Sequence, residues 1–268
     1  MVGDPLPADL AGAVARAGFP PIVYFNEVDS TNDAALSLAA DGAPEFTAVL
    51  ADLQRAGRGR RGRPWYSPPG AGMYLSAVVR AQGLDMRVPL VTLAAGVAVA
   101  EAVLELSGLP VELKWPNDVV IGRPWRKVAG ILCEATALGT AQGAVVVGMG
   151  VNLLRAAYPP EVADRATSLD AECDRAVVLA DLVVACLQRL RDGVALLRAD
   201  RAGEVLDRWR ARGRAGLDAA PVRWHDDRGL CRGIAYGLAD DGALLVRYDG
   251  QQERLIAGDV VWEMLSRV

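Results

Sequence analysis

A stretch rich in glycine and arginine, residues 54–65, constrains the fold of this chain more than any other feature. It reads QRAGRGRRGRPW and lies between two apolar runs, residues 47–53 and 73–79, that are predicted as strands. Glycine tolerates positive φ and lets backbone amides approach a ligand closely. The stretch therefore predicts a loop that joins two strands of a sheet, which is a common place for binding residues.

The loop concentrates positive charge in a chain that is acidic as a whole. It holds five arginines, whereas the formal net charge of the chain is −4. Guanidinium groups grip phosphates well, and Trp65 at the end of the loop offers a flat apolar face to a ring. A solvated basic loop or an RGG-like nucleic-acid contact remains an alternative from this stretch alone. A general polyanion-binding surface is disfavoured by the acidic balance.

Composition and residue usage exclude several classes of protein. The chain has 268 residues, of which 52% are hydrophobic, as in soluble globular proteins. Residues 1–17 contain no secretory signal, and the most apolar run, residues 88–100, falls short of the ~20 residues of a membrane span. The four cysteines show no CxxC spacing, which favours a cytoplasmic location. His225 is the only histidine, which excludes histidine triads and multi-histidine zinc sites.

The order of predicted elements indicates an α+β fold with a second, smaller β domain. We expect a short leader (residues 1–21), a mixed sheet with packed helices (22–216) and a small β-barrel of hairpins (217–268). The last part is predicted from short apolar runs separated by close turn signals. Helices are predicted after residue 30, over residues 88–106, over residues 179–197 and around residues 205–209.

Polar residues cluster where the first of these helices begins. Asp29 or Ser30 can cap the helix, and capping alone accounts for the cluster. The functional alternative is that Ser30, Thr31 and Asn32 direct donors and acceptors into a small-molecule pocket beside the helix N-terminus.

Further candidate residues follow in the middle of the chain. Lys114, Asn117 and Asp118 form a polar corner before a hairpin whose second arm begins with Lys127. Lys127 is either a simple edge charge or a point charge for a carboxylate or phosphate. Asn152 lies in a buried strand broken by glycines, so its amide needs a backbone or ligand partner.

Taken together, these segments resemble the biotin–protein ligases. The resemblance rests on five blocks in order: Asp29-Ser30-Thr31-Asn32; Gln54 with Ala56 to Arg63 and Trp65; Lys114-Trp115-Pro116-Asn117-Asp118; Lys127 with Ala129 to Leu132 and Glu134; and Gly148 to Asn152. The terminal β segments, with Gly233-Ile234-Ala235 and Asp241 to Leu245, are also similar to the C-terminal domain of that family. The resemblance implies a class II synthetase-like catalytic domain and an SH3-like C-terminal domain.

The resemblance also implies a reaction in two steps. The carboxylate of biotin attacks the α-phosphate of ATP, which yields biotinyl-5′-AMP and pyrophosphate. A lysine of a biotin carboxyl carrier domain then attacks the mixed anhydride. Such chemistry requires cancelled repulsion and stabilised charge at phosphorus rather than a protein nucleophile. Mg2+ is expected to be coordinated mainly by the phosphates of ATP.

The family's functional residues carry over onto matching positions of this chain. Lys127 and Arg60 match the catalytic positions, and Asp118 is a weaker candidate for ordering metal or water; no protein metal site is predicted. The biotin positions are Ser30, Thr31, Asn32, Gln54, Gly57, Arg58, Gly59, Arg60 and Lys127. The ATP or adenylate positions are Arg58, Arg60, Trp65, Asn117, Lys127 and Asn152. Closure of the loop over the intermediate is expected to exclude water.

Some features depart from the family pattern, and rivals remain. Some ligases carry an N-terminal winged helix, for which residues 1–21 are too short, so no DNA binding is expected. No membrane binding is expected either, because the most apolar run is shorter than a membrane span. The hairpin that contains Trp125 is long for the family. Lipoate–protein ligase or octanoyl transferase is the nearest alternative, and the arginine loop and terminal β domain favour biotin over it. A non-enzymatic nucleic-acid binder and an inactive biotin sensor are the others.

Overall fold

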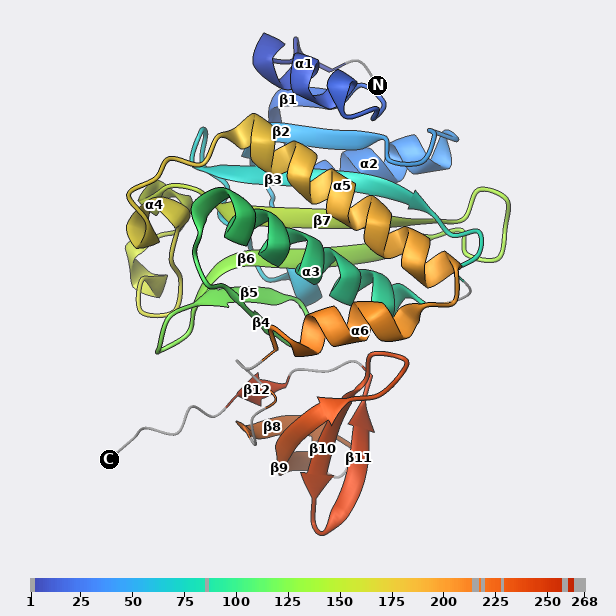
Figure 1. Ribbon diagram of the computed structural model, residues 1–268, viewed down its shortest axis with the longest axis vertical. Helices are drawn as coiled ribbons and strands as arrows, with labels where there is room; N and C mark the ends of the chain where they lie inside the picture. The colour runs from blue at the N-terminus through green and yellow to red at the C-terminus, as the bar shows by residue number, and fades with distance from the viewer. Residues whose placement is uncertain are drawn as a thin grey trace.

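A seven-stranded mixed sheet and a five-stranded antiparallel sheet organise the protein (Figure 1). The computed structural model describes residues 3–84, 87–213, 217, 220–227, 229–256 and 260–262. In spatial order the strands of the first sheet are β1 (Val23–Val28), β2 (Ala48–Gln54), β3 (Gly72–Arg80), β7 (Ala144–Asn152), β6 (Arg126–Thr136), β5 (Asp118–Ile121) and β4 (Glu112–Lys114). Strands β1 and β2 pair in parallel, and the other neighbours pair antiparallel. The predicted α+β fold with a mixed sheet is confirmed.

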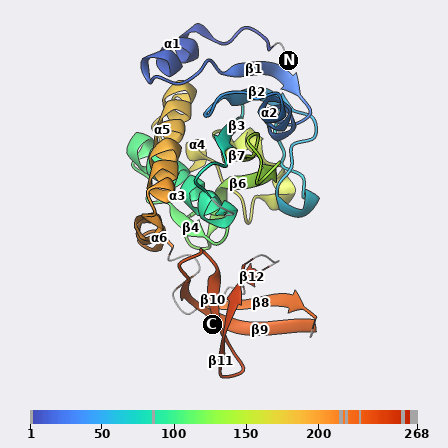
Figure 2. The ribbon, with the colours of Figure 1, turned by 90° about the vertical axis from the view of Figure 1, so that its right-hand side faces the viewer.

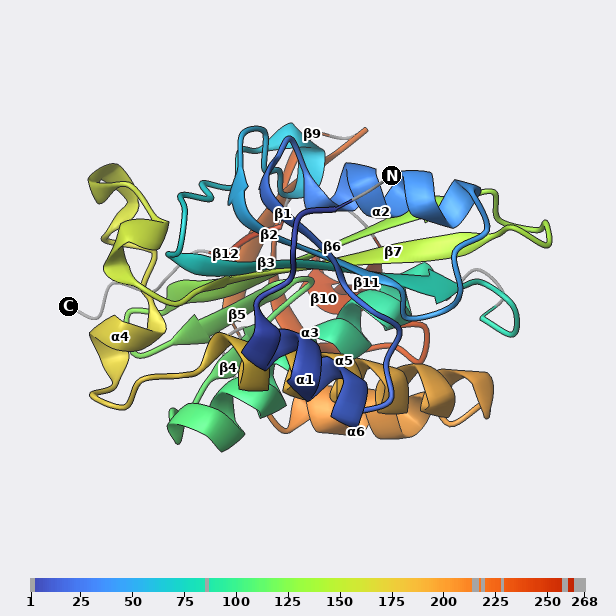
Figure 3. The ribbon, with the colours of Figure 1, turned by 90° about the horizontal axis from the view of Figure 1, so that it is seen from above.

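Helices cover the two faces of the first sheet unequally. Helices α3 (Val88–Ser107) and α5 (Leu179–Arg198) pack on one face, and α6 (Ala202–Arg210) packs beside them (Figure 2). On the other face lies α2 (Thr31–Ala40), which is half as long as α3 (Figure 3). One face of the sheet is therefore only partly covered by helix.

The alternation of side chains along β7 matches this unequal cover. Val145, Val147, Met149 and Val151 point into the large core beneath α3 and α5. On the opposite face, Ala144 and Val146 pack in a smaller cluster beneath α2. The next positions on that face are Gly148, Gly150 and Asn152, so the apolar side chains end where the helix cover ends.

Helix α3 is the central element of the core. The apolar run continues past Glu101 to Ser107, so the helix reaches 20 residues and is long and apolar enough to cross a membrane by length and composition. Twelve of its residues are nevertheless buried within the protein, against the sheet and against α5 and α6. Gly108, at φ 75°, ends it in the left-handed conformation that glycine accepts readily.

The segment expected to be a leader packs onto the same core. It contains helix α1 (Ala8–Arg16), whose Leu10 and Val14 are buried among the residues of the large cluster. The helix lies beside α5, and the backbone of Asp4 bridges to Tyr24 in β1. Residues 3–21 thus contribute to the unit that the first sheet organises.

The short strands predicted at the end of the chain form the second sheet. It contains β8 (Ala220–Asp226), β9 (Gly229–Leu238), β10 (Leu244–Tyr248), β11 (Gln251–Leu255) and β12 (Val261–Trp262), in the order β11-β10-β9-β8-β12. Among the described residues no pairing joins the edge strands β11 and β12, so closure into a barrel stays a prediction. The turn before β10 touches the first unit, because the indole nitrogen of Trp115 donates to the carbonyl of Gly242 at 3.0 Å.

We expect Leu93→Ala to destabilise the protein by about 3 kcal/mol. Leu93, a residue of α3, faces the core and is only 1% exposed, so its truncation leaves a cavity. The control is Leu104→Ala in the same helix, where Leu104 is 39% exposed. Urea unfolding followed by circular dichroism measures both changes. Equal loss of stability in the two variants would contradict this description of the core.

Candidate functional site

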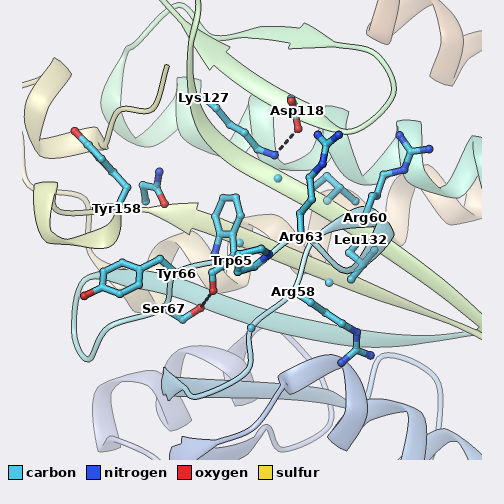
Figure 4. Close-up of a pocket in the computed structure, with 18 of the residues that line it drawn as sticks. Arg58, Arg60, Arg63, Trp65, Tyr66, Ser67, Asp118, Lys127, Leu132 and Tyr158 are labelled. Atoms are coloured by element: carbon cyan, nitrogen blue, oxygen red, sulfur yellow. Dashed lines mark hydrogen bonds and ion pairs between the residues drawn. The ribbon is translucent and has the colours of Figure 1, made fainter. Parts of the chain in front are cut away.

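A cavity of about 1350 Å³ opens on the face of the sheet that α2 leaves uncovered (Figure 4). Strands β3, β6 and β7 provide its floor, and the arginine loop between β2 and β3 provides one wall. All of the residues assigned to biotin, to the adenylate or to catalysis from the sequence line it, namely Ser30, Thr31, Asn32, Gln54, Gly57, Arg58, Gly59, Arg60, Trp65, Asn117, Asp118, Lys127 and Asn152. The fold therefore brings all of these positions, which are distant in sequence, into one cavity.

Glycines in the central strands make room for this cavity. A Cβ atom built on Gly148 would lie 2.3 Å from the side-chain oxygen of Asn32, and one built on Gly150 would lie 2.7 Å from the ring of Trp65. Gly130, which pairs with Gly150 across the sheet, would place a Cβ 2.9 Å from the amine of Lys127. The space above these glycines is thus taken by the side chains of Asn32, Trp65 and Lys127.

The polar residues at the start of α2 form hydrogen bonds with the floor. Ser30 is the N-cap residue, but its side chain makes no capping hydrogen bond. The backbone N–H and the hydroxyl of Thr31 both donate to Oε1 of Gln54, at 2.9 and 3.1 Å. The amide of Asn32 donates to the carboxylate of Glu134 at 2.7 Å. The cluster is therefore a connected polar surface rather than a set of caps.

Hydrogen bonds close the neck of the arginine loop, which is the place where its two ends, near residues 54 and 67, lie side by side. The amide of Gln54 donates to the hydroxyl of Ser67 at 2.9 Å, and the backbone N–H of Trp65 donates to the carbonyl of Gly57 at 2.8 Å. A Cβ on Gly57 would lie 2.5 Å from the carbonyl oxygen of Trp65, so this position accepts only glycine without movement.

Beyond the neck, the loop folds back on itself around a short 3-10 turn, Arg60–Gly62. The backbone N–H of Gly59 donates to the carbonyl of Arg63 at 2.7 Å. Arg60 and Arg63 line the cavity, and in Figure 4 their side chains extend to the opposite side of the loop from Arg58. The guanidinium of Arg58 instead reaches two carboxylates, and the hydrogen bonds that it donates, first to Asp33 and then to Glu134, raise its pKa.

Lys127 reaches the cavity because of a β-bulge. Val119 pairs with Ala129 and Val120 pairs with Lys127, so one extra residue, Val128, lies between them on β6. The extra residue turns Lys127 to the same face as Gly130. Its amine lies 2.5 Å from a carboxylate oxygen of Asp118 and 5.2 Å from the ring centroid of Trp65.

Two predicted asparagines are held by backbone groups. The amide of Asn117 donates to the carbonyl of Ile131, and the amide of Asn152 donates to the carbonyl of Thr167, both at 2.9 Å. Each still lines the cavity. Lys114 also lines it, and burial lowers the pKa of its amine, against the opposing effect of Asp118.

Two further walls were not predicted from the sequence. One is the segment after β7, which contains the 3-10 turns Arg155–Ala157 and Pro160–Val162 and helix α4 (Leu169–Glu172) and places Tyr158 and Arg165 at the cavity. The other is β12, whose Val261 and Trp262 come from the second sheet. Neither segment carries a sequence pattern that signals a ligand.

Charge in the cavity is strongly unbalanced. Within the described part of the chain, seven basic side chains line it: Arg55, Arg58, Arg60, Arg63, Lys114, Lys127 and Arg165. Asp118 is the single carboxylate in that lining, and it is paired with Lys127. The described residues also contain no group of three or more His, Cys, Asp or Glu that could hold a metal ion. The cavity thus suits a polyanionic ligand.

The chain matches two protein families. Residues 24–152 match the Biotin/lipoate A/B protein ligase family, and residues 221–262 match the family of the biotin protein ligase C-terminal domain. The first match contains the cavity floor and the arginine loop, and the second contains most of the second sheet.

Known proteins are similar along most of the chain. The biotin--[acetyl-CoA-carboxylase] ligase of Mycobacterium tuberculosis is 35% identical and is covered over 91% of its length, with 92% of this chain aligned. The enzyme of the same name from Paracoccus denitrificans is also 35% identical, with 87% of this chain and 96% of that protein aligned. The solved biotin protein ligase from Aquifex aeolicus in complex with biotin and ATP has a TM-score of 0.78 at 27% identity, covering 91% of this chain and 99% of that one. These likenesses show that the chain belongs to the biotin protein ligase family.

Proposed function

We propose that this protein is an ATP-dependent biotin–protein ligase that activates biotin as biotinyl-5′-AMP and transfers it to a lysine of a biotin carboxyl carrier domain. The observation that carries the proposal is the cavity itself, in which seven basic side chains surround a hydrogen-bonding floor. Membership of the family and the names of the similar enzymes support the same activity.

In the first half-reaction, a carboxylate oxygen of biotin bonds to the α-phosphorus of ATP, and the bond from that phosphorus to the bridging oxygen of pyrophosphate breaks. Both reactants are anions, so their repulsion must be offset before they meet. Arg60 and Lys127 line the cavity and supply fixed positive charge for this purpose. Biotin's uncharged head group is assigned to the polar surface beside the floor that is formed by Thr31, Asn32 and Gln54.

Lys127 is assigned to the carboxylate of biotin and the α-phosphate. Its amine is held 2.5 Å from Asp118, which keeps the cation on the cavity side of β6. Trp65, whose ring lies 5.2 Å from that amine, is assigned to the adenine base, and Asn117 and Asn152 to the adenylate. Because both asparagines already donate to backbone carbonyls, their remaining oxygens are acceptors for the nucleotide.

Mg2+ accompanies the phosphates in this proposal. The lining offers the single carboxylate of Asp118, and a lone carboxylate plus substrate phosphates is a common arrangement for this ion. The ion would neutralise charge on the phosphates as they leave as pyrophosphate.

In the second half-reaction, the ε-amine of a carrier lysine attacks the carbonyl carbon of the mixed anhydride, and AMP leaves. The carrier is proposed as the biotin carboxyl carrier domain of a biotin-dependent carboxylase, consistent with the names of the similar enzymes. The proposal includes a cytoplasmic location and no binding to DNA or membranes, which fits the formal net charge of −4 of the chain.

The activity is tested by incubating the purified protein with radiolabelled biotin, ATP, Mg2+ and a biotin carboxyl carrier domain. We expect ATP-dependent label on the carrier and none on a carrier whose acceptor lysine is replaced. Parallel incubation with labelled lipoate and a lipoyl domain should give no transfer. Transfer of lipoate, or no transfer of either, would overturn the proposal.

Lys127→Ala is expected to slow adenylate formation by about a hundredfold or more, because one positioned charge that meets developing negative charge is removed. Quenched single-turnover formation of biotinyl-5′-AMP measures the rate. Arg123→Ala, in the same hairpin but outside the cavity lining, serves as the control. A Lys127→Ala rate equal to that of the control would refute the role.

Arg60→Gly is expected to release biotinyl-5′-AMP about tenfold faster, since the loss of one charge-assisted contact corresponds to about 1.4 kcal/mol. Arg61→Gly is the matched control, because Arg61 does not line the cavity and its φ of 57° is one that glycine accepts. Filter-retention of labelled intermediate measures the release. Retention unchanged by Arg60→Gly would argue against loop closure over the adenylate.

A further inference from the structure

One continuous set of hydrogen bonds joins the middle of the arginine loop to its neck through the side of the cavity. In the middle of the loop Arg58 donates to Glu134, and at the neck Ser67 accepts from Gln54. The complete path runs Arg58–Glu134–Asn32–Ser76–Thr31–Gln54–Ser67. Three residues of this path, Asn32, Thr31 and Gln54, are the ones assigned to biotin, and Glu134 and Ser76 connect them to one another and to the loop.

Glu134 is the junction between the loop and the floor. Its Oε2 accepts from the amide of Asn32 at 2.7 Å and from the guanidinium of Arg58 at 3.1 Å, and its Oε1 accepts from Arg58 at 3.2 Å. Glu134 follows Gly130 and Leu132 on the cavity face of β6, although it is not part of the cavity lining. The carboxylate therefore contacts the loop through Arg58 and the polar surface through Asn32, without lining the cavity itself.

The Arg58 contacts differ from the other ion pairs of the loop. Arg58 makes a bidentate pair with Asp33, with both distances 2.6 Å, in addition to its contact with Glu134. Its side chain is 27% exposed and that of Glu134 is 30% exposed. Arg55, by contrast, pairs with Asp29 and Glu27 where the arginine side chain is 60% exposed. Exposed pairs contribute little, so the half-buried contact of Arg58 with Glu134 contributes more to holding the loop than the ion pairs of Arg55 do.

We propose that Glu134 is a positioning residue that holds the arginine loop over the cavity through Arg58 and couples the loop to the biotin-binding floor through Asn32. When a ligand engages Asn32, the orientation of that amide changes the contact that Glu134 makes, and Arg58 responds through the same carboxylate. The coupling to biotin rests on the proposed function. The anchoring of the loop stands on the geometry of the ligand-free protein.

Replacing Glu134 with glutamine removes one of the two acceptor oxygens that Asn32 and Arg58 use, and it leaves the size of the side chain almost unchanged. A carboxylate presents two acceptor oxygens, whereas an amide presents one acceptor and one donor group. Asn32 and Arg58 are both donors here, so Glu134→Gln leaves one of them facing an N–H. The substitution therefore weakens the junction in either orientation of the amide.

Limited proteolysis of the biotin-free protein tests the anchor directly. Trypsin cleaves after arginine, and the loop contains several such sites, so its cleavage rate reports how often the loop opens. We expect Glu134→Gln to raise the rate of cleavage within residues 55–63 about tenfold, with sites identified by mass spectrometry. Glu45→Gln is the matched control: Glu45 pairs with Arg198, is similarly exposed at 28% and lies outside the cavity lining. It should leave that rate unchanged.

Asp33→Asn provides a second, independent variant. The carboxylate of Asp33 accepts from Arg58 and, within the part of the chain that the structure describes, makes no side-chain hydrogen bond with Asn32; it lies on the exposed side of the pair. We expect faster loop cleavage in this variant as well. Loop cleavage at the wild-type rate in both variants, with the fold intact by circular dichroism, would overturn the anchor.

Steady-state kinetics separate the coupling from a purely structural role. We expect Glu134→Gln to raise the KM for biotin about tenfold with kcat changed less than about threefold, and Asp33→Asn to leave the KM for biotin near wild type. An unchanged KM for biotin in Glu134→Gln would overturn the coupling. Failure of the wild-type protein to biotinylate a carrier would instead overturn the proposed function. The proteolysis experiment would still test the anchoring of the loop, because it uses the biotin-free protein.

Discussion

The cavity exists because glycines leave one part of one sheet face without side chains. Gly148 lies beneath the first turn of α2 and Gly130 and Gly150 lie beneath Lys127 and Trp65, and a Cβ on any of them would come within 3.0 Å of one of these side chains. On the reverse face the same strands carry large apolar residues packed against α3 and α5. Because that packing fixes the strands, the open face stays a rigid floor on which polar groups from distant segments can be arranged.

The geometry of the reactive groups follows from this floor and from a single bulge. The extra residue on β6 brings Lys127 to the face of the glycines, where Asp118 holds its amine. Without that bulge the lysine would face the core under α3, where an unpaired charge is costly. The backbone of Lys127 also pairs with the segment after β7, which encloses the cavity from another side. Fold and site are thus linked through backbone pairing at one residue.

Much of the fold could be predicted from local patterns. The apolar alternation and the turn residues predict the strands on both sides of the arginine loop, the long helix α3 and the short terminal strands. The cavity residues were located through the joint order of short motifs rather than by any single motif. The motifs resemble those of a known family, and the cavity gathers all of them.

Other features depend on tertiary contacts that local patterns do not contain. The bulge at Val128 changes which face Lys127 occupies, although the sequence there reads as an ordinary strand. Residues 8–16 form a helix because the core beside α5 receives Leu10 and Val14. The pairing of Arg58 with Asp33 and Glu134 joins residues 25 and 76 positions apart, and no spacing rule anticipates it.

The central claim is that this cavity joins biotin to the α-phosphate of ATP. Biotin-dependent exchange of radiolabelled pyrophosphate into ATP, measured without any carrier, tests it most directly because exchange requires reversible adenylate formation. We expect exchange that depends on biotin and is absent with lipoate or octanoate. Exchange supported equally by lipoate, or no exchange with biotin, would contradict it.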